Sequence, residues 1–294
     1  MKFGVREIAN VVFRAKSAVK IGNTEFQAKQ PVLYIDTATT STLEGAATTV
    51  YAQGGRGNTR LIAWEGEKTL TFTVEDALLS PIGFSILSGA GLIKGKEEDE
   101  QYINVHVTST ALIESDGTIN LEDALSAGEQ ICPNAPLFVI GTEADGSATG
   151  EVYQVDYDVD TAKLKVKDAK GYGKTVIVDY YVSRKSSTVS EIQIDAENFA
   201  GFYYVEAETL FRRQDTGVDM PAIITLPNVK IQSNFTFTMA SSGDPSTFTF
   251  TMDAFPGYTY FDQTKKVLCV IQVVEDNEAA QVEWETVMPH GEGH

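Results

Sequence analysis

The sequence predicts a mainly β protein: a sandwich or barrel subunit with one short flanking helix and an inserted small β domain. Runs of alternating apolar and polar residues recur along the chain, and clusters of Gly, Asn, Asp and Ser separate them. This spacing is typical of an all-β fold. The predicted strands lie at residues 31–36, 60–74, 102–108, 137–141, 151–157, 163–167, 175–183, 189–195, 202–211, 228–239, 246–253 and 267–275.

Helical signals are few and short. Ser80-Pro81 combines an N-cap residue with proline at the first helical position, and Gly89 supplies a stop. We therefore expect one short helix, or two broken turns, over residues 75–89, and another short helix at 121–127. The apolar side chains expected to pack the first of these against a sheet are Leu78, Leu79, Ile82, Ile86 and Leu87.

The segment 234–255 has the clearest pattern in the chain. Two runs of Phe/Thr alternation flank Ser-Ser-Gly-Asp-Pro, which predicts a β-hairpin with one residue type on each face. One face is expected to hold Phe235, Phe237, Phe248 and Phe250, and the other Thr236, Thr238, Thr247, Thr249 and Thr251. In the strand at 60–74, Thr69, Thr71 and Thr73 alternate with apolar residues in the same way.

Two interpretations of these threonine faces stay open. Threonine is common in strands, and half-solvated antiparallel sheets ordinarily alternate apolar and polar side chains. A face of uncharged hydroxyls backed by aromatic residues also suits a wet surface that must not hold a passing molecule.

The residue pattern of the sequence changes near residues 109 and 190. Between them lie acidic turns and three strand patterns that resemble a compact β-module. We therefore predict a discontinuous β domain made of residues 1–108 and 191–294, with an inserted β domain at 109–190. Insertion into a surface loop costs little, because closure entropy grows slowly with loop length.

Residues 36–60 are predicted to form a long polar connection. Connections of this length inside a compact domain are usually functional or disordered. One interpretation is a floppy surface hairpin, and the other is an arm that becomes ordered only against the acidic surface of a neighbouring subunit. The residues that suit such an arm are Gly54, Gly55, Arg56, Gly57, Asn58 and Arg60.

Composition narrows the classes of function. The chain has 294 residues, with 43% hydrophobic and 22% charged residues, as expected for a folded globular protein. Its 41 acidic and 23 basic side chains give a net charge of −18, which argues against binding nucleic acid through phosphates. Cys132 and Cys269 are expected to be free thiols, and we expect no signal peptide, no membrane span and folding in a reducing cytoplasm.

Catalytic and metal-binding signals are weak, so we predict no enzyme activity, no cofactor and no metal site. His106 lies in a strand pattern without a nucleophile signature, and His290 and His294 lie in a Gly-rich tail without a ligand set. Gly173-Lys174-Thr175 is similar to the end of a phosphate-binding loop, but a strand follows it instead of a helix. We interpret that tripeptide as a hairpin turn.

Three segments together resemble the tail tube (major tail) proteins of long-tailed bacteriophages, and of the contractile-tailed kind in particular. They are the strand and helix at 59–91, the Phe/Thr segment at 226–257, and the polar connection at 36–60. The resemblance covers about the first hundred and the last hundred residues and leaves out the middle segment. It implies a tail-tube-type β-sandwich or barrel that assembles into hexameric rings stacked as a tube in the virion tail, built in the host cytoplasm.

The resemblance also implies partners and residue roles. The DNA genome passes through the lumen during ejection without specific binding, and the chain contacts itself, a tail sheath or other tail proteins. The loop at 54–60 reaches the adjacent ring, and the threonine faces line the lumen. Six subunits that each lend four strands give a barrel of roughly 48 Å across the backbone, and side chains narrow it to roughly 38 Å. Duplex DNA, roughly 20 Å wide, fits this bore.

Two other interpretations remain. A capsid-decorating or sheath-associated β-protein has the same composition, and differs in staying small until a capsid is present. A carbohydrate-binding module or glycan-processing enzyme would use Tyr203, Tyr204, Tyr258 and Tyr260 for stacking, and Glu206 with Glu208 for acid–base chemistry.

Overall fold

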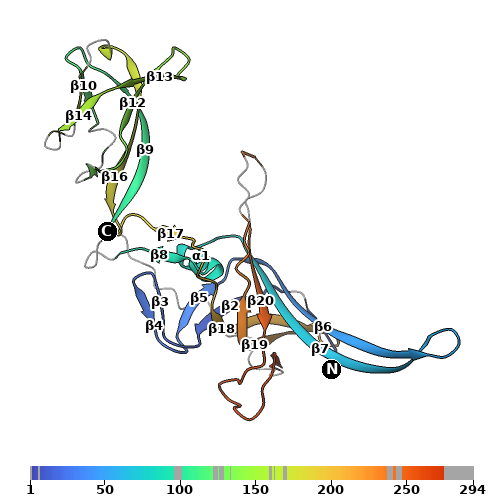
Figure 1. Ribbon diagram of the computed structural model, residues 1–294. Helices are drawn as coiled ribbons and strands as arrows, with labels where there is room; N and C mark the ends of the chain where they lie inside the picture. Colours follow the sequence, from blue (N-terminus) through green and yellow to red (C-terminus); the bar gives the residue numbers. More distant parts are fainter. Residues whose placement is uncertain are drawn as a thin grey trace. The chain divides into compact units, whose positions relative to one another are not determined.

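The structure is a computed structural model of the chain, which folds as two compact units (Figure 1). It describes residues 2–5, 7–95, 101–121, 125, 129–132, 134–158, 161, 163–167, 171–236, 241–242 and 247–274. Unit 1 combines residues 1–92 with 192–294, and unit 2 comprises residues 93–191. The fold is mainly β, of the sandwich type, and the described residues contain a single α-helix.

The boundary between the units differs from the sequence prediction at its N-terminal side. We predicted that the insert begins at 109, whereas the structure divides the chain after Leu92. The reason is β9 (Tyr102–Leu112), which pairs along its whole length with β16 (Thr175–Lys185) and so belongs to the insert.

Unit 1 is built on one nine-stranded antiparallel sheet with the strand order β5-β2-β18-β19-β20-β7-β6. β1 also pairs with β18, and β21 also pairs with β19. The elements of this unit are β1 (Phe3–Val5), β2 (Asn10–Ala15), β3 (Val19–Ile21), β4 (Thr24–Phe26), β5 (Pro31–Ile35), β6 (Ala38–Gly54), β7 (Thr59–Asp76), α1 (Pro81–Ser88), β18 (Phe202–Arg213), β19 (Asp219–Ile231), β20 (Phe248–Ala254) and β21 (Val270–Val273). The short strands β8 (Gly91–Ile93) and β17 (Glu191–Gln193) pair with each other where the chain passes between the units.

The core of unit 1 lies against one face of this sheet. Alternate residues of its strands point into the core, as Phe13 of β2 and Val205 of β18 do. The helix α1 adds Phe84, Ile86 and Leu87, and the β3–β4 hairpin adds Ile21 and Phe26. On the other face, threonine and carboxylate side chains cover β6, β7 and β20, whereas Tyr204 of β18 packs against Tyr260.

The helix α1 confirms the predicted signals at both of its ends. The Ser80 hydroxyl accepts a hydrogen bond from the Gly83 amide at 3.0 Å, and Pro81 opens the helix. Gly89 ends it with φ of 75°, and a Cβ there would lie 2.3 Å from the Phe199 carbonyl carbon. The prediction was wrong for residues 75 and 76, which end β7, and for Leu78, which is 68% exposed.

The predicted 234–255 hairpin is only partly correct. β20 has the expected alternation, with Phe250 buried and Thr249 exposed. Its main partner, however, is β7, because β19 ends at Ile231 and residues 232–236 leave the sheet. β19 pairs with β21 before Pro227 and with β20 after it. Residues 237–240 and 243–246 lie outside the described part of the chain.

The prediction that 36–60 is an irregular connection is wrong, whereas the interpretation of this segment as part of a surface hairpin is correct. Residues 38–54 form β6, which pairs with β7 in a long antiparallel hairpin, and the turn is limited to residues 55–58 (Figure 1). Within the single chain, the segment therefore pairs with β7 as a strand and is not an irregular connection. The sequence of β6, with many Thr, Ala and Gly residues, lacks a clear strand pattern. Its pairing with β7 is what defines it as a strand.

Unit 2 contains two antiparallel sheets around a core of its own. The larger has the order β11-β16-β12-β13 with β9 on the other side of β16, and the smaller has the order β10-β15-β14. Besides β9 and β16, its elements are β10 (Thr118–Asn120), β11 (Gln130–Ile131), β12 (Phe138–Thr142), β13 (Ala148–Tyr153), β14 (Val155–Asp158) and β15 (Lys163–Val166). The predicted strand at 151–157 is divided at Gln154 between the two sheets, and both parts contribute to the same core. Of the predicted helix at 121–127, residues 122–124 and 126–127 are outside the described residues.

Candidate assembly surfaces

The polar face of β6, β7 and β20 forms one continuous surface, which we call the hydroxyl face. The register places Thr73 of β7 between Thr42 of β6 and Thr251 of β20. Thr71 lies in the same way between Glu44 and Asp253. The hydroxyl face consists of Thr40, Thr42, Glu44, Thr69, Thr71, Thr73, Glu75, Thr249, Thr251 and Asp253.

The opposite side of the same three strands holds the core. Phe72, Val74, Phe250 and Met252 are each at most 1% exposed. Packing of these side chains fixes the register, since a shift of one residue would turn the threonines inward. The hydroxyl face is thus a consequence of the core behind it.

The structure places some of the predicted lumen residues on the hydroxyl face and others elsewhere. Thr69, Thr71, Thr73, Thr249 and Thr251 lie on the hydroxyl face. Thr247 is exposed just before β20, Thr236 is exposed outside any strand, and Thr238 lies outside the described residues. Sequence reasoning missed Thr40 and Thr42, because it took β6 for a connection.

Acidic groups are interspersed with the hydroxyls. Asp253 accepts hydrogen bonds from Gln232 Nε2 at 3.0 and 3.2 Å and from the Thr71 hydroxyl at 3.4 Å. Glu44 and Glu75 add two carboxylates, and Lys230 lies opposite Asp253 in the register. The face carries more negative than positive charge, which disfavours the binding of a polyanion.

Beyond the hydroxyl face, β6 and β7 continue as a two-stranded ribbon that we call the distal arm, residues 47–68. β20 pairs with β7 only over residues 71–76, so among the described strands the arm is paired within itself alone. Figure 1 shows the two strands running on together away from the rest of the unit 1 sheet. A bulge at Thr48, whose hydroxyl accepts a hydrogen bond from the Glu67 amide at 2.9 Å, marks where the arm begins.

Large apolar side chains are exposed on the distal arm. Val50 is 63% exposed, Ile62 54% and Trp64 52%. Val50 is paired with Trp64, and Ala52 with Ile62, so these residues share one face of the ribbon. Two-stranded ribbons are marginal on their own, and a cluster of exposed apolar residues marks an interaction surface.

The tip of the arm contains the predicted inter-ring residues. Gly55 and Gly57 have φ of 78° and 90°, which suits the tight turn that they form with Arg56 and Asn58. Gly54 ends β6, and Arg60 lies in β7 with its guanidinium 4.0 Å from the centroid of the Tyr51 ring. The tip therefore presents two arginines from an otherwise acidic chain.

Comparison with known proteins places these surfaces in a context. The YomU/Tube protein family matches residues 6–267. The chain belongs to this family. The match includes the hydroxyl face, the distal arm and unit 2, and membership indicates a structural protein of a phage tube. No curated protein matches the chain.

Membership and structure bear on the other interpretations of the sequence. Tyr203 and Tyr204, predicted to stack on sugars, are 6% and 3% exposed, and burial raises the pKa of Tyr203 to about 12. Glu206 pairs with Arg14 at 2.9 Å. The predicted sugar-binding surface is therefore wrong for the two tyrosines of β18.

Neither a metal-binding cluster nor a membrane-spanning helix occurs among the described residues. Among the described residues, no group of three His, Cys, Asp or Glu side chains is arranged to hold a metal ion. None of the described helices has the length and apolar character needed to cross a membrane. The strand residue His106 is half exposed and pairs through Nε2 with Asp179 on the neighbouring strand.

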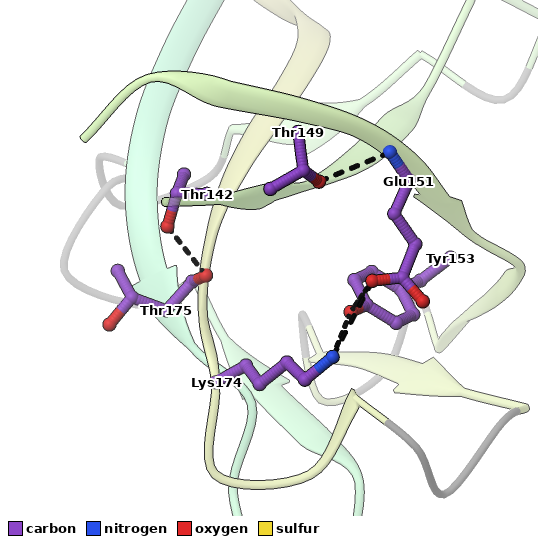
Figure 2. Close-up of polar contacts among 6 residues, drawn as sticks. All are labelled: Thr142, Thr149, Glu151, Tyr153, Lys174 and Thr175. Carbon is purple, nitrogen blue, oxygen red and sulfur yellow. Dashed lines mark hydrogen bonds and ion pairs between the residues drawn. The ribbon is translucent and has the colours of Figure 1, made fainter. Parts of the chain in front are cut away.

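The predicted turn at Gly173-Lys174-Thr175 has a structural role in unit 2 (Figure 2). The Lys174 ammonium lies 3.1 Å from the Tyr153 hydroxyl and 3.4 Å from Glu151 Oε2, while Tyr153 donates to Glu151 at 2.7 Å. The hydrogen bond with Tyr153, and then the charge of Glu151, raise the pKa of Lys174. The lysine ties β13 to the turn before β16.

Proposed function

We propose that the chain is the major tail tube protein of a contractile-tailed phage, assembled as hexameric rings that stack into a tube. The DNA genome passes through the lumen during ejection without specific binding. The role is structural rather than enzymatic, with no cofactor and no membrane partner. The observation that carries this proposal is the continuity between the hydroxyl face and an arm whose apolar residues are exposed in the single chain.

The hydroxyl face supports a lumen role. It is rich in threonine and net negative, so it can be wetted without attracting phosphates. The net charge of −18 has the same sign. In the assembled ring these strands line the bore, and Thr69, Thr71, Thr73, Thr249 and Thr251 face the DNA.

The strand edges support ring closure. β6 ends the nine-stranded sheet, extends over 17 residues and contains neither proline nor lysine. Such a long bare edge invites pairing with another chain. In the proposed ring, the next subunit covers this edge, and the barrel so formed has none.

The distal arm supports stacking. Its exposed face of Val50, Ile62 and Trp64 gains burial only on another copy, and its tip carries Arg56 toward an acidic neighbour. Unit 2 faces outward, where its mass leaves the bore open and where a sheath or other tail proteins can contact it.

The test is the assembly state of the purified chain. Negative-stain electron microscopy and sedimentation velocity are expected to show hollow polymers of uniform width, with six subunits per ring in averaged end views. A protein that stays monomeric at every concentration would overturn the proposal. Small oligomers that bind only to capsids would favour a decoration protein instead.

A further inference from the structure

The connection between β20 and β21 is an ordered lobe, residues 255–269. The Tyr260 ring stacks on Tyr204, with centroids 4.0 Å apart and planes 10° from parallel. Gly257 and Val267 pair by two backbone hydrogen bonds of 2.9 and 3.0 Å, which close the base of the lobe. Stacking and pairing fix the lobe to the sheet through its interior residues.

The tip of the lobe presents an aromatic side chain to solvent. Phe261 is 94% exposed, the largest exposed fraction among the large apolar residues described. Asp262 accepts hydrogen bonds from the Thr264 amide and hydroxyl at 2.8 and 2.6 Å, and its own amide donates to the Thr259 hydroxyl at 3.0 Å. This closed turn holds Phe261 outward.

The lobe is also cationic at its far side. Lys265 and Lys266 follow the turn and are both exposed, and the Lys266 ammonium lies 5.5 Å from the centroid of the Tyr258 ring. The tip thus combines one preorganised aromatic ring with two ammonium groups. Aromatic side chains, phenylalanine included, are enriched at protein interfaces, and charged groups at the rim contribute to the choice of partner.

A cavity elsewhere in unit 1 has the complementary character. It has a volume of about 320 Å³ and a mixed lining, in which Leu33, Leu79 and Phe250 are apolar and Thr37 and Ser80 are polar. A cavity of about 150 Å³ has room for a benzene ring, so the volume of this one is sufficient for a phenylalanine side chain, which its apolar residues would contact. Asp36 and Asp76 are the carboxylates of its lining.

The charge around the cavity is negative. Asp36 is exposed at the rim, whereas Asp76 is buried and accepts a hydrogen bond from Thr37. Desolvation raises the pKa of Tyr34, which also lines the cavity, and the nearby charges of Asp36 and Glu208 raise it further. A basic group at the rim would relieve this accumulation of negative charge.

The lobe and the cavity lie at opposite ends of β5. The Lys29 ammonium, just before β5, is 5.4 Å from the centroid of the Tyr260 ring, while the cavity is lined by Leu33 at the middle of the strand and by Asp36 just after it. Two different patches at two ends make a heterologous contact, in which each copy uses its lobe on one neighbour and its cavity on the next. Such contacts propagate into rings or filaments.

We propose that Phe261 of one copy inserts into the cavity formed by Leu33, Leu79 and Phe250 of a second copy, with Lys265 and Lys266 beside Asp36 at its rim. This inference rests on the proposed self-assembly and identifies a pair of surfaces that make it. It adds a second contact to the one made by the distal arm.

The test measures the critical concentration for assembly by sedimentation of the full chain. Phe261→Ala is expected to raise it by about tenfold or more, since burial of a phenylalanine side chain is lost. Phe199→Ala, an exposed phenylalanine in another loop of unit 1, is the matched control and is expected to leave it unchanged. Both residues are exposed, so thermal unfolding of the monomer is expected to stay the same for both variants.

A charge reversal identifies the partner surface. The double variant Lys265→Glu with Lys266→Glu is expected to raise the critical concentration several-fold, and adding Asp36→Lys in the same chain is expected to bring it back toward the unsubstituted value. If Phe261→Ala assembles as the unsubstituted chain does, or if Asp36→Lys restores nothing, this inference is wrong although the tube proposal stands. If the unsubstituted chain never assembles, both fail.

Discussion

The two halves of the β6–β7 hairpin belong to one antiparallel ladder but differ in the burial and the chemical character of their faces. In the proximal half, near the core, one face is buried through Phe72 and Val74 and the other is the hydroxyl face. In the distal arm both faces are exposed, yet Val50, Ile62 and Trp64 are as apolar as core residues. The proximal half is explained by the fold of one chain. The distal half finds no such explanation within the described chain, and we propose that another copy covers it.

This difference separates stability from assembly within one hairpin. Burial of apolar area stabilises a fold wherever the partner surface belongs to the same chain. Where the partner surface belongs to another copy, the same side chains stabilise the polymer instead. Substitutions on the two halves should therefore change different measurable quantities.

The largest effect is expected in the proximal half. Phe72→Ala removes a ring that is 1% exposed and leaves a cavity, which costs about 3–5 kcal/mol of unfolding free energy. Urea unfolding of the monomer measures it. The neighbouring substitution Thr73→Ala, on the hydroxyl face, is the control and is expected to cost below about 1 kcal/mol. Equal losses for the two variants would contradict the assignment of faces.

An intermediate effect is expected in the distal arm. The double variant Ile62→Ala with Trp64→Ala leaves monomer unfolding unchanged to within about 0.5 kcal/mol, because both side chains are already exposed. Its critical concentration for assembly is expected to rise by about a hundredfold, since two anchors of the interface are lost. Sedimentation measures the shift.

The control for this variant is a pair on the other face of the arm. Thr49 and Glu65 lie opposite each other in the ladder, and replacing both with alanine keeps the ribbon but leaves the apolar face intact. We expect assembly close to that of the unsubstituted chain. A loss as large as that of the apolar pair would mean that the arm acts through its shape rather than through its apolar face.

The smallest difference between the unsubstituted chain and the arm variant is expected at Cys269, which packs against the same core as the proximal half. Burial raises the pKa of this thiol to about 11, so at pH 8 it is expected to react with iodoacetamide about a hundredfold more slowly than in the unfolded chain. The rate should be the same in the chain with Ile62→Ala and Trp64→Ala, as peptide mapping of the alkylated cysteine can show. A faster reaction in that variant would show that the arm supports the core.

The sequence predicted the elements whose signals are local. The alternation in β7, β16, β18 and β20 revealed those strands, and Ser80, Pro81 and Gly89 delimited α1. It also placed Thr71, Thr73, Thr249 and Thr251 on polar faces, because period two is a property of the strand itself.

The sequence does not show which strands pair with one another. β6 combines Thr, which favours strands, with Ala and Gly, which do not, and it lacks a regular alternation of apolar and polar residues, so only its pairing with β7 defines it as a strand. For the same reason the partner of β20 was predicted as 234–239, its neighbour in sequence, whereas β7 lies far away along the chain. The hydroxyl face and the distal arm are products of these distant pairings.

Hydrogen–deuterium exchange of the distal arm tests the central claim most directly. Amides of residues 47–68 are expected to exchange rapidly in the monomer and to become protected at least tenfold in the assembled form, while those of β18 stay protected in both. Assembled particles in which the arm exchanges as fast as in the monomer would contradict the claim that another copy covers it.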